Sequence, residues 1–200
     1  ILSIVPQPFH SPFSTLLIPC TRRYHDDPNN TVPPCMTLLD HPSTALRAGM
    51  RRLAASVCVI TTVDGSGQRH AMTATAVTSV SDDPASLLVC VNRHTTLHNI
   101  LAQGGRFAVN VLSADQADIS MLCASGESGE SRFAQGQWGD ANGLPYLRDA
   151  QAVFFCRTAR QMTHGTHLIA IGDVDKALVA DDAVNPLLYA DGQYRRLNEE

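Results

Sequence analysis

The sequence lacks the features that mark several common classes of protein. It has six cysteines but no CxxC pair, which argues against a zinc site because such sites need closely spaced Cys and His ligands. Its net charge is -4 and no basic cluster is longer than a pair such as Arg51-Arg52 or Arg195-Arg196, so no nucleic-acid footprint is expected. No apolar run approaches the roughly 20 residues of a membrane-spanning helix. We therefore expect a soluble, cytoplasmic protein with no metal, nucleic-acid or membrane partner.

The composition is that of a globular domain. The chain has 200 residues, of which 44% are hydrophobic and 17% charged, and this length suffices for one domain with a proper core. Cys58, Cys90 and Cys156 each lie within an apolar strand pattern. We expect them to be buried, reduced thiols.

The N-terminal segment differs from the rest of the chain. Prolines interrupt every potential element there: Pro6, Pro8, Pro19, Pro28, Pro33 and Pro34. We predict a poorly ordered, Pro-rich extension over residues 1–36 and a folded domain over 37–200. Because Met36 would be a natural start, residues 1–35 could reflect a misassigned translation start. The intact mass of the protein from its native host tests this, and a mass that includes residues 1–35 would exclude it.

Strand patterns dominate the rest of the chain. A helix is expected over about 43–54 with Ser43 as N-cap, and further helices over 95–105 and 114–124. A hairpin is expected around residues 64–67, and strands over 85–92, 106–112, 152–162, 166–180, 186–191 and 193–197. Strands and helices do not alternate regularly, so we predict a mainly β, antiparallel barrel or sandwich with a few attached helices. Gly65 and Gly67 lie in the hairpin turn and form no dinucleotide fingerprint, and "GESGES" lacks the Lys of a phosphate loop.

The stretch from His70 to Ser81 alternates between two kinds of side chain. Met72, Ala74, Ala76 and Val80 would face the core, whereas Thr73, Thr75, Ser79 and Ser81 would face the other way. Such a hydroxyl face suits a flat polar ligand close to the backbone. The alternative is a Thr-rich strand with a solvated face.

Several motifs in register resemble the short-chain flavin reductase family, the reductase components of two-component flavin-dependent monooxygenases. They are "RAGMRRLAASVCVITTVDGSGQRHAMTATAVTSVSDDPASLLVCVNRHTTLHNIL", "GRFAVNVLSADQ", "SRFAQGQW", "GLPYLRDAQAVFFC", "GTHLIAIGDV" and "PLLYADGQYRRL". The branch that looks most similar contains 4-hydroxyphenylacetate and chlorophenol monooxygenase reductases and the pyrimidine-utilisation reductase. The resemblance implies a homodimeric split β-barrel that binds FMN or FAD near the dimer interface, with NAD(P)H docked over the flavin.

The resemblance also implies where the flavin lies. The segment Thr75, Ala76, Val77 and Thr78 would line the isoalloxazine ring. The ribityl and phosphate part would be wrapped by Asn92, Arg93, His94, Thr95, Thr96, Leu97, His98 and Asn99. A helix N-terminus with hydroxyls and a nearby arginine suits phosphate, although Thr95 could equally be an ordinary N-cap.

Three further segments are carried over from the family. Ser128, Arg132 and Phe133 would close over the flavin tail, although a charged, glycine-broken surface loop would look the same. His167 would sit beside the nicotinamide as the best candidate for an effect on rate; otherwise it is a polar residue at a strand end. Tyr189 and Gly192 would contact the nicotinamide nucleotide, or else belong to an edge strand and its turn.

The chain departs from the family at two positions. Ala85 follows Pro84 where a second proline is usual in the family. This change should relax the turn and should not affect the flavin site. Asp191 replaces the usual basic residue before Gly192. Because recognition of a 2′-phosphate needs positive charge, we predict NADH over NADPH.

The expected activity is hydride transfer from NADH to FMN or FAD, with reduced flavin diffusing to a separate oxygenase. No nucleophile elbow or paired base supports a Ser-His-Asp or Cys-His mechanism. Two alternatives stay open: a reductase that keeps its flavin and passes electrons to a cobalt corrinoid, and a non-catalytic flavin-binding module with the same barrel.

Overall fold

The computed structural model describes residues 39–126 and 129–197. The predicted extension over residues 1–36 lies outside this part of the chain. The described helices are α1 (Pro42–Met50), α2 (Thr96–Ala102), α3 (Ala117–Ala124) and the 3-10 helix η1 (Gly129–Phe133). The described strands are β1 (Ala55–Ser56), β2 (Cys58–Val63), β3 (Arg69–Ala74), β4 (Val77–Asp82), β5 (Ala85–Asn92), β6 (Arg106–Val111), β7 (Trp138–Ala141), β8 (Leu144–Leu147), β9 (Ala152–His164), β10 (His167–Val179), β11 (Leu188–Ala190) and β12 (Gln193–Arg195).

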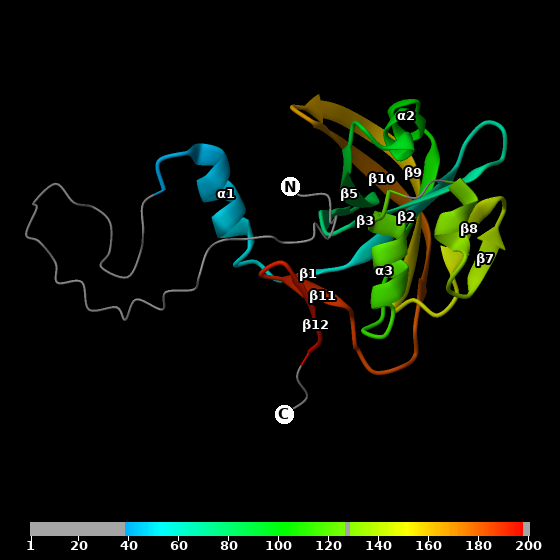
Figure 1. Ribbon diagram of the computed structural model, residues 1–200. Helices are drawn as coiled ribbons and strands as arrows, with labels where there is room; N and C mark the ends of the chain where they lie inside the picture. The colour runs from blue at the N-terminus through cyan, green and yellow to red at the C-terminus, as the bar shows by residue number, and fades with distance from the viewer. Residues whose placement is uncertain (1–38, 127–128, 198–200) are drawn as a thin grey trace, which may run out of the picture.

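The main sheet is antiparallel and curls into a barrel. Its seven strands run in the order β3-β2-β6-β9-β10-β5-β4 (Figure 1). The two end strands, β3 and β4, follow each other in the chain and are joined by Thr75 and Ala76. The amide of Cys90 on β5 donates a hydrogen bond of 3.1 Å to the carbonyl of Ala76, which extends the pairing of β5 with β4 into the link between the two edge strands. This confirms the predicted antiparallel barrel with a few attached helices.

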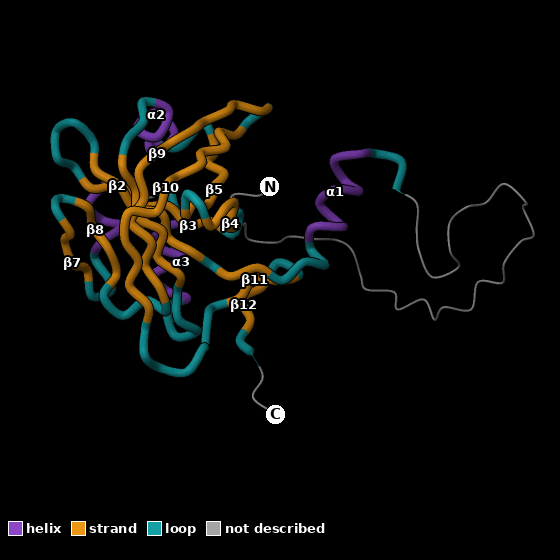
Figure 2. The backbone as a smooth tube through the Cα atoms, turned by 180° about the vertical axis from the view of Figure 1, so that it is seen from behind, coloured by secondary structure: helices purple, strands orange, loops and turns teal. Residues whose placement is uncertain are grey.

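Strands β2, β6 and β9 carry apolar side chains on both faces, because neighbouring residues of a strand point to opposite sides. Val153 and Phe155 of β9 belong to an outer cluster, which α3, η1 and the β7–β8 hairpin cover. Cys156 belongs to the inner cluster within the barrel. Leu97 and Leu101 of α2, 1% and 0% exposed, are part of this inner cluster. The tube in Figure 2 shows α2 at one end of the barrel and the β11–β12 hairpin toward the other.

A buried asparagine joins the β7–β8 hairpin to the main sheet. The side-chain amide of Asn110 donates to the carbonyl of Val59 (2.9 Å) and to the hydroxyl of Thr61 (3.3 Å). Its side-chain oxygen accepts a hydrogen bond of 2.7 Å from the amide of Leu147 on β8. The hydroxyl of Thr61 in turn donates to the carbonyl of Pro145 (2.5 Å). Every polar atom of the Asn110 side chain therefore has a partner in a place that water does not reach.

A glycine on β10 allows close packing inside the barrel. A Cβ atom at Gly172 would lie 2.5 Å from Cζ of Phe107 and 2.9 Å from Cβ of Cys156. Phe107 is fully buried, so its ring has little room to move. The absence of a side chain at Gly172 thus lets β10 lie against the Phe107 ring.

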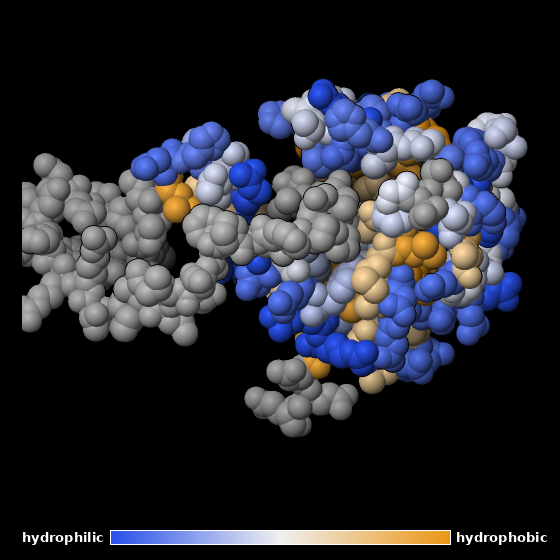
Figure 3. Space-filling view, in the orientation of Figure 1, coloured by the Kyte–Doolittle hydropathy of each residue, from blue (hydrophilic) through white to orange (hydrophobic). Residues whose placement is uncertain are grey.

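A second, three-stranded sheet, β1-β11-β12, lies beside helix α1. Arg51, just after α1, pairs with Asp191 at the turn between β11 and β12 (Nε to Oδ1, 3.0 Å). The ribbon in Figure 1 and the tube in Figure 2 both show α1 standing apart from the barrel, and no residue of α1 is buried. Leu46 and, just beyond the helix, Leu53 are 56% and 58% exposed. Hydrophobic surface is visible on this helix in Figure 3.

Helix α1 differs from its predicted bounds at both ends. It begins at Pro42 with His41 as N-cap, and the hydroxyl of Ser43, the predicted N-cap, lies 2.9 Å from Nδ1 of His41. Proline suits the first position of a helix, where its missing N–H costs nothing. The helix ends at Met50 because the carbonyl of Arg51 accepts the amide of Asp191 (2.9 Å), which commits the chain to the small sheet.

The predicted two-faced strand over residues 70–81 is wrong in two respects. The register of β4 against β5 shifts between Ser79 and Ser81, so Val80 lies at a β-bulge and is 47% exposed instead of facing the core. Thr73 is buried under α3 and donates a hydrogen bond of 2.6 Å to the carbonyl of Ser120. The hydroxyl face is therefore covered at Thr73 and is partly exposed only from Thr75 onward.

The described cysteines agree with the expectation of reduced thiols: Cys58, Cys90, Cys123 and Cys156 are all free. Burial raises the pKa of Cys58, Cys123 and Cys156 to about 12. Among the helices of residues 39–126 and 129–197, none is long and apolar enough to span a membrane.

Candidate functional site

Three of the predicted segments meet at the ends of strands β5 and β10. His167, the first residue of β10, lies directly opposite Asn92, the last residue of β5. The amide of Arg93 donates a hydrogen bond of 3.0 Å to the carbonyl of Thr166. The carbonyl of Ala76 accepts a hydrogen bond from the amide of Cys90. Cys90 precedes Asn92 by two residues on β5, a distance of about 7 Å along the strand. The structure thus places the Thr75–Thr78 segment, the Asn92–Asn99 segment and His167 next to one another.

A compact turn leads from β5 into α2. The side-chain oxygen of Asn92 accepts the amide of His94 (3.0 Å), and the carbonyl of Asn92 accepts both the amide (3.0 Å) and the hydroxyl (2.8 Å) of Thr95. Thr95 is the N-cap residue of α2, but its hydroxyl makes no capping hydrogen bond to the helix. The N–H groups of the first helical turn therefore have no side-chain cap, and they suit the oxygens of a phosphate.

The remaining residues of the Asn92–Asn99 segment divide by exposure. Leu97 is 1% exposed and packs in the inner cluster, so its side chain cannot reach a ligand. Arg93, Thr96 and Asn99 are exposed, as is His94, whose Nε2 lies 3.5 Å from Nε of Arg93. His98 is half-buried, with Nδ1 3.2 Å from the side-chain oxygen of Asn99. The exposed basic and polar side chains therefore gather around the N-terminal end of α2.

His167 is held at the tip of the β9–β10 hairpin. Its Nδ1 lies 2.9 Å from the hydroxyl of Thr166. Burial lowers the pKa of His167, which favours a neutral imidazole at neutral pH. A neutral ring can both hydrogen-bond to an amide and stack against a flat heterocycle.

Ser125 and the 3-10 helix η1 are anchored on strand β3 through Arg132. Ser128 lies outside the described residues. The guanidinium of Arg132 donates to the carbonyls of Ala71 and Ser125, the latter at 2.9 Å. Arg132 therefore ties this segment to the edge of β3.

Phe133 is 7% exposed and belongs to the outer cluster. Its ring packs edge-on against Trp138 with centroids 4.8 Å apart, and the guanidinium of Arg69 lies 4.2 Å from its centroid. Arg69 also pairs with Glu130 through Nε and Oε2 at 3.1 Å. The structure does not bring the Phe133 ring to Asn92 and His167.

Tyr189 lies on β11, and Gly192 lies at the turn between β11 and β12. The Tyr189 ring packs against the Tyr194 ring with centroids 5.6 Å apart. The Tyr194 hydroxyl lies 2.8 Å from the hydroxyl of Ser120. The carbonyl of Ser120 accepts a hydrogen bond from Thr73. Figure 1 shows β11 and β12 well separated from α2. Within one chain, these two predicted residues are therefore not part of the cluster around His167.

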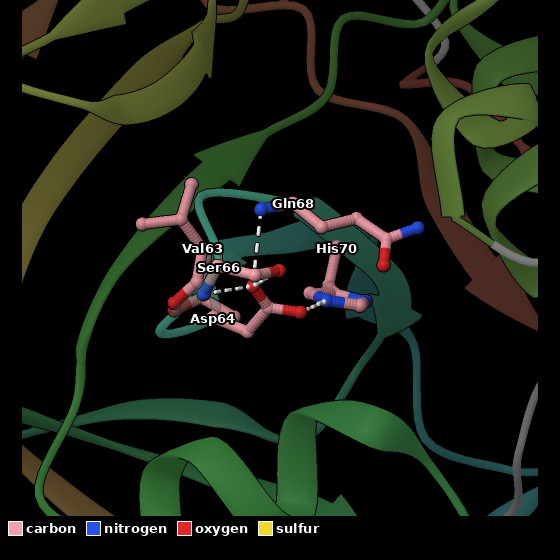
Figure 4. Close-up of polar contacts among 6 residues, drawn as sticks. Val63, Asp64, Ser66, Gln68 and His70 are labelled. Carbon is pink, nitrogen blue, oxygen red and sulfur yellow. Dashed lines mark hydrogen bonds and ion pairs between the residues drawn. The ribbon is translucent and has the colours of Figure 1, made fainter.

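Another polar cluster lies at the tip of the β2–β3 hairpin (Figure 4). One carboxylate oxygen of Asp64 accepts the hydroxyl of Ser66 (2.6 Å) and the amides of Ser66 (2.9 Å) and Gln68 (3.0 Å). Its other oxygen lies 2.9 Å from Nε2 of the buried His70. These hydrogen bonds, foremost those of Ser66 and His70, hold the pKa of Asp64 well below its usual range. Asp64 stands between Ser66 and His70, so the three do not form a Ser–His pair that could activate a nucleophile.

Sequence reasoning did not find Thr166. The only sequence signal for Thr166 was its position between Gly165 and the predicted His167. Its contacts with His167 and Arg93 depend on the β9–β10 hairpin and on the pairing of β5 with β10. Among the described residues, no group of His, Cys, Asp or Glu side chains is arranged to hold a metal ion.

Comparison with known proteins gives consistent matches over most of the chain. A sequence profile described as "Flavin reductase like domain" matches residues 50–198. The reductase component of the FADH(2)-dependent resorcinol hydroxylase of Rhizobium sp. (strain MTP-10005) is 46% identical over 150 residues, which cover 74% of this chain and 83% of that protein. The FMN reductase (NADH) RutF of Pseudomonas syringae pv. syringae (strain B728a) is 38% identical over 157 residues, 78% of this chain and 87% of that protein. The solved structure of BorF, the flavin reductase component of a bacterial two-component tryptophan halogenase, matches with a TM-score of 0.71 and 36% identity over 79% of this chain and 99% of BorF.

Proposed function

The chain belongs to the flavin reductase like domain family, and we propose on this basis that it transfers hydride from NADH to FMN or FAD and supplies the reduced flavin to a separate oxygenase. The observation that carries the proposal is the family match over residues 50–198, which includes all three segments of the site. The geometry supports it, because a neutral histidine and a helix N-terminus suited to phosphate lie side by side.

The nicotinamide and the flavin supply the redox chemistry themselves when bound, since hydride passes directly between the two rings. The task of the chain is then to orient the two rings. The Thr75–Thr78 segment would provide backbone groups to the flavin ring, and the start of α2 with Arg93 would hold the phosphate. His167 would orient the nicotinamide. Fixing two reactants in this way lowers the entropic part of the barrier.

We assign NADH as the preferred reductant. Related proteins carry NADH in their names. Asp191 places a carboxylate where the family usually has a basic residue, and its side chain is 66% exposed although it pairs with Arg51. A carboxylate at that place disfavours a 2′-phosphate by repulsion.

The proposed active form is a homodimer. Apolar side chains line the outward face of the β5–β10–β9 sheet next to the site: Leu88, Ile169 and Ile171 are half-buried and Met162 is 59% exposed. Helix α1 presents a further apolar face away from the barrel. A second copy would cover both surfaces and would bring its own β11–β12 turn toward His167. Sedimentation velocity at micromolar protein tests this, and a monomer that retains full activity would refute it.

The partner is expected to be a flavin-dependent oxygenase, reached by diffusion of the reduced flavin. The first of the related proteins is named as the reductase component of an FADH(2)-dependent hydroxylase, and BorF as the flavin reductase component of a two-component halogenase. We place the protein in the cytoplasm, which the four free thiols among the described residues support because they suit a reducing compartment.

The deciding experiment is anaerobic oxidation of NADH by the purified protein, with FMN and FAD added separately in excess. We expect the absorbance of the flavin to be bleached over many turnovers, and the better flavin identifies the preferred substrate. Flavin binding without NADH oxidation would refute the enzyme and favour a binding module. Turnover that requires a cobalt corrinoid as acceptor would favour the corrinoid reductase.

A further inference from the structure

We propose that Thr166 is a positioning residue that fixes the orientation of the His167 ring at the nicotinamide side of the site. The proposal rests on the proposed function, because it concerns how that site receives NADH. Its basis is a set of contacts at the tip of the β9–β10 hairpin.

The backbone of Thr166 is fixed from two sides. Gly165 and Thr166 form the turn between His164 and His167, which pair directly across the hairpin. Gly165 has a φ of 56°, a conformation that glycine adopts readily and that a tight hairpin turn requires. The carbonyl of Thr166 accepts the amide of Arg93 from the turn after β5, at 3.0 Å. The Thr166 side chain therefore starts from a backbone position that neighbouring strands define.

The hydroxyl of Thr166 is hydrogen-bonded to one of the two ring nitrogens of His167. The distance from Oγ1 to Nδ1 is 2.9 Å, which is a hydrogen bond of ordinary length. Either group of this pair could donate. In the proposed arrangement the hydroxyl donates to Nδ1, which leaves the ring proton on Nε2. Nε2 then faces away from Thr166 as a donor, which suits the carboxamide oxygen of a nicotinamide.

The same contact limits rotation of the ring. His167 is only half-buried, so packing alone leaves its ring free to turn. A partner on Nδ1 fixes both the tautomer and the ring plane, as it does for histidines that bind metals. Arg93, which belongs to the phosphate-binding turn, holds Thr166 itself, so the two halves of the site share one fixed element.

The first test is independent of turnover. Imidazole nitrogen chemical shifts of His167, assigned by comparison with His167→Gln, report which nitrogen carries the proton. We expect mainly the Nε2–H form in the wild type and in Thr166→Ser, and a shift toward a mixture in Thr166→Val, which keeps the branched shape but loses the hydroxyl. An unchanged tautomer in Thr166→Val would overturn the proposal.

The second test is kinetic. We expect Thr166→Val to raise the KM for NADH about fivefold, the size that the loss of one neutral hydrogen bond gives, with flavin affinity unchanged and Thr166→Ser near the wild type. In a His167→Ala background, Thr166→Val should have no further effect, because it acts through the imidazole. An equal effect in both backgrounds, or none in the wild-type background, would refute the positioning role. A wild type that oxidises no NADH would instead refute the proposed function, and the tautomer measurement separates the two failures.

Discussion

His167 lies directly opposite Asn92 across the β10–β5 pair, 75 positions away in the chain. The next backbone hydrogen bond, from Arg93 to Thr166, continues this pairing beyond the ends of the strands. The segment assigned to the flavin phosphate and the histidine assigned to the nicotinamide are thus parts of one hydrogen-bonded sheet. Their separation is set by the backbone, so mutations of single side chains should change affinity without displacing the other half of the site.

Replacing His167 with Ala should raise the KM for NADH or slow flavin reduction about fivefold to tenfold, with flavin affinity near that of the wild type, because the imidazole in the proposed site contacts only the nicotinamide side. Anaerobic stopped-flow reduction and flavin titration measure the two effects. His41→Ala, the same change at the N-cap of α1, is the matched control and should leave both unchanged. Unaltered kinetics in His167→Ala would remove this residue from the site.

Replacing Asn110 with Leu should destabilise the domain by about 2–4 kcal/mol, because the amide of Leu147 and the carbonyl of Val59 would lose their partners in a buried place. Chemical denaturation measures the free energy of unfolding. Gln137→Leu, a similar change at an exposed position, should stay within about 0.5 kcal/mol of the wild type. Equal stabilities of the two variants would contradict the role given to the Asn110 network.

Replacing Gly172 with Ala should destabilise the domain by about 1–3 kcal/mol, since the added methyl group would lie 2.5 Å from the buried ring of Phe107. Thermal denaturation measures the change. Gly49→Ala is the control, because a Cβ at Gly49 meets nothing within 4 Å and alanine favours a helix. A Gly172→Ala variant as stable as the wild type would show that the barrel can expand at this point.

The Asp64 network predicts a pH-dependent stability. Because the pKa of Asp64 is lower in the folded than in the unfolded chain, its contribution is fully present above about pH 4 and is lost as the pH falls through the folded value. The Tm of the wild type should therefore exceed that of Asp64→Asn at pH 7, and the gap should narrow toward pH 3. A gap that is constant with pH would argue against this linkage.

Selectivity for the reductant provides a further prediction. The wild type should use NADH with a higher kcat/KM than NADPH, and Asp191→Asn should raise the relative kcat/KM for NADPH several-fold by removing a negative charge. Asparagine is the appropriate replacement because Asp191 has a φ of 52°, which asparagine tolerates. A kinetic preference of the wild type for NADPH would contradict the assignment of NADH.

The sequence predicted most of the sheet, because long strands such as β9 and β10 carry strong apolar patterns between clear turn residues. It missed the β7–β8 hairpin, whose strands have four residues each and include Pro145, so that alternation could not be recognised. It also misplaced Val80, because a bulge reverses the alternation without any signature in composition.

The site was less accessible from the sequence than the fold. Resemblance supplied His167 and the Asn92–Asn99 segment, but their contact depends on strand register, which period-two patterns do not define between distant strands. From the sequence alone, an aromatic residue such as Phe133 could belong either to a ligand site or to the hydrophobic core. Only the packing of Trp138 and Arg69 around its ring shows that it lies in the outer cluster.

The free thiols of this barrel have a consequence for its chemical durability. Free reduced flavin that misses its oxygenase reacts with dioxygen and generates peroxide, which attacks cysteine as the thiolate. Because burial raises the pKa of Cys58, Cys123 and Cys156 to about 12, very little of each thiol is ionised at pH 7. These three thiols of the barrel therefore resist the oxidant that the reductase's own product forms.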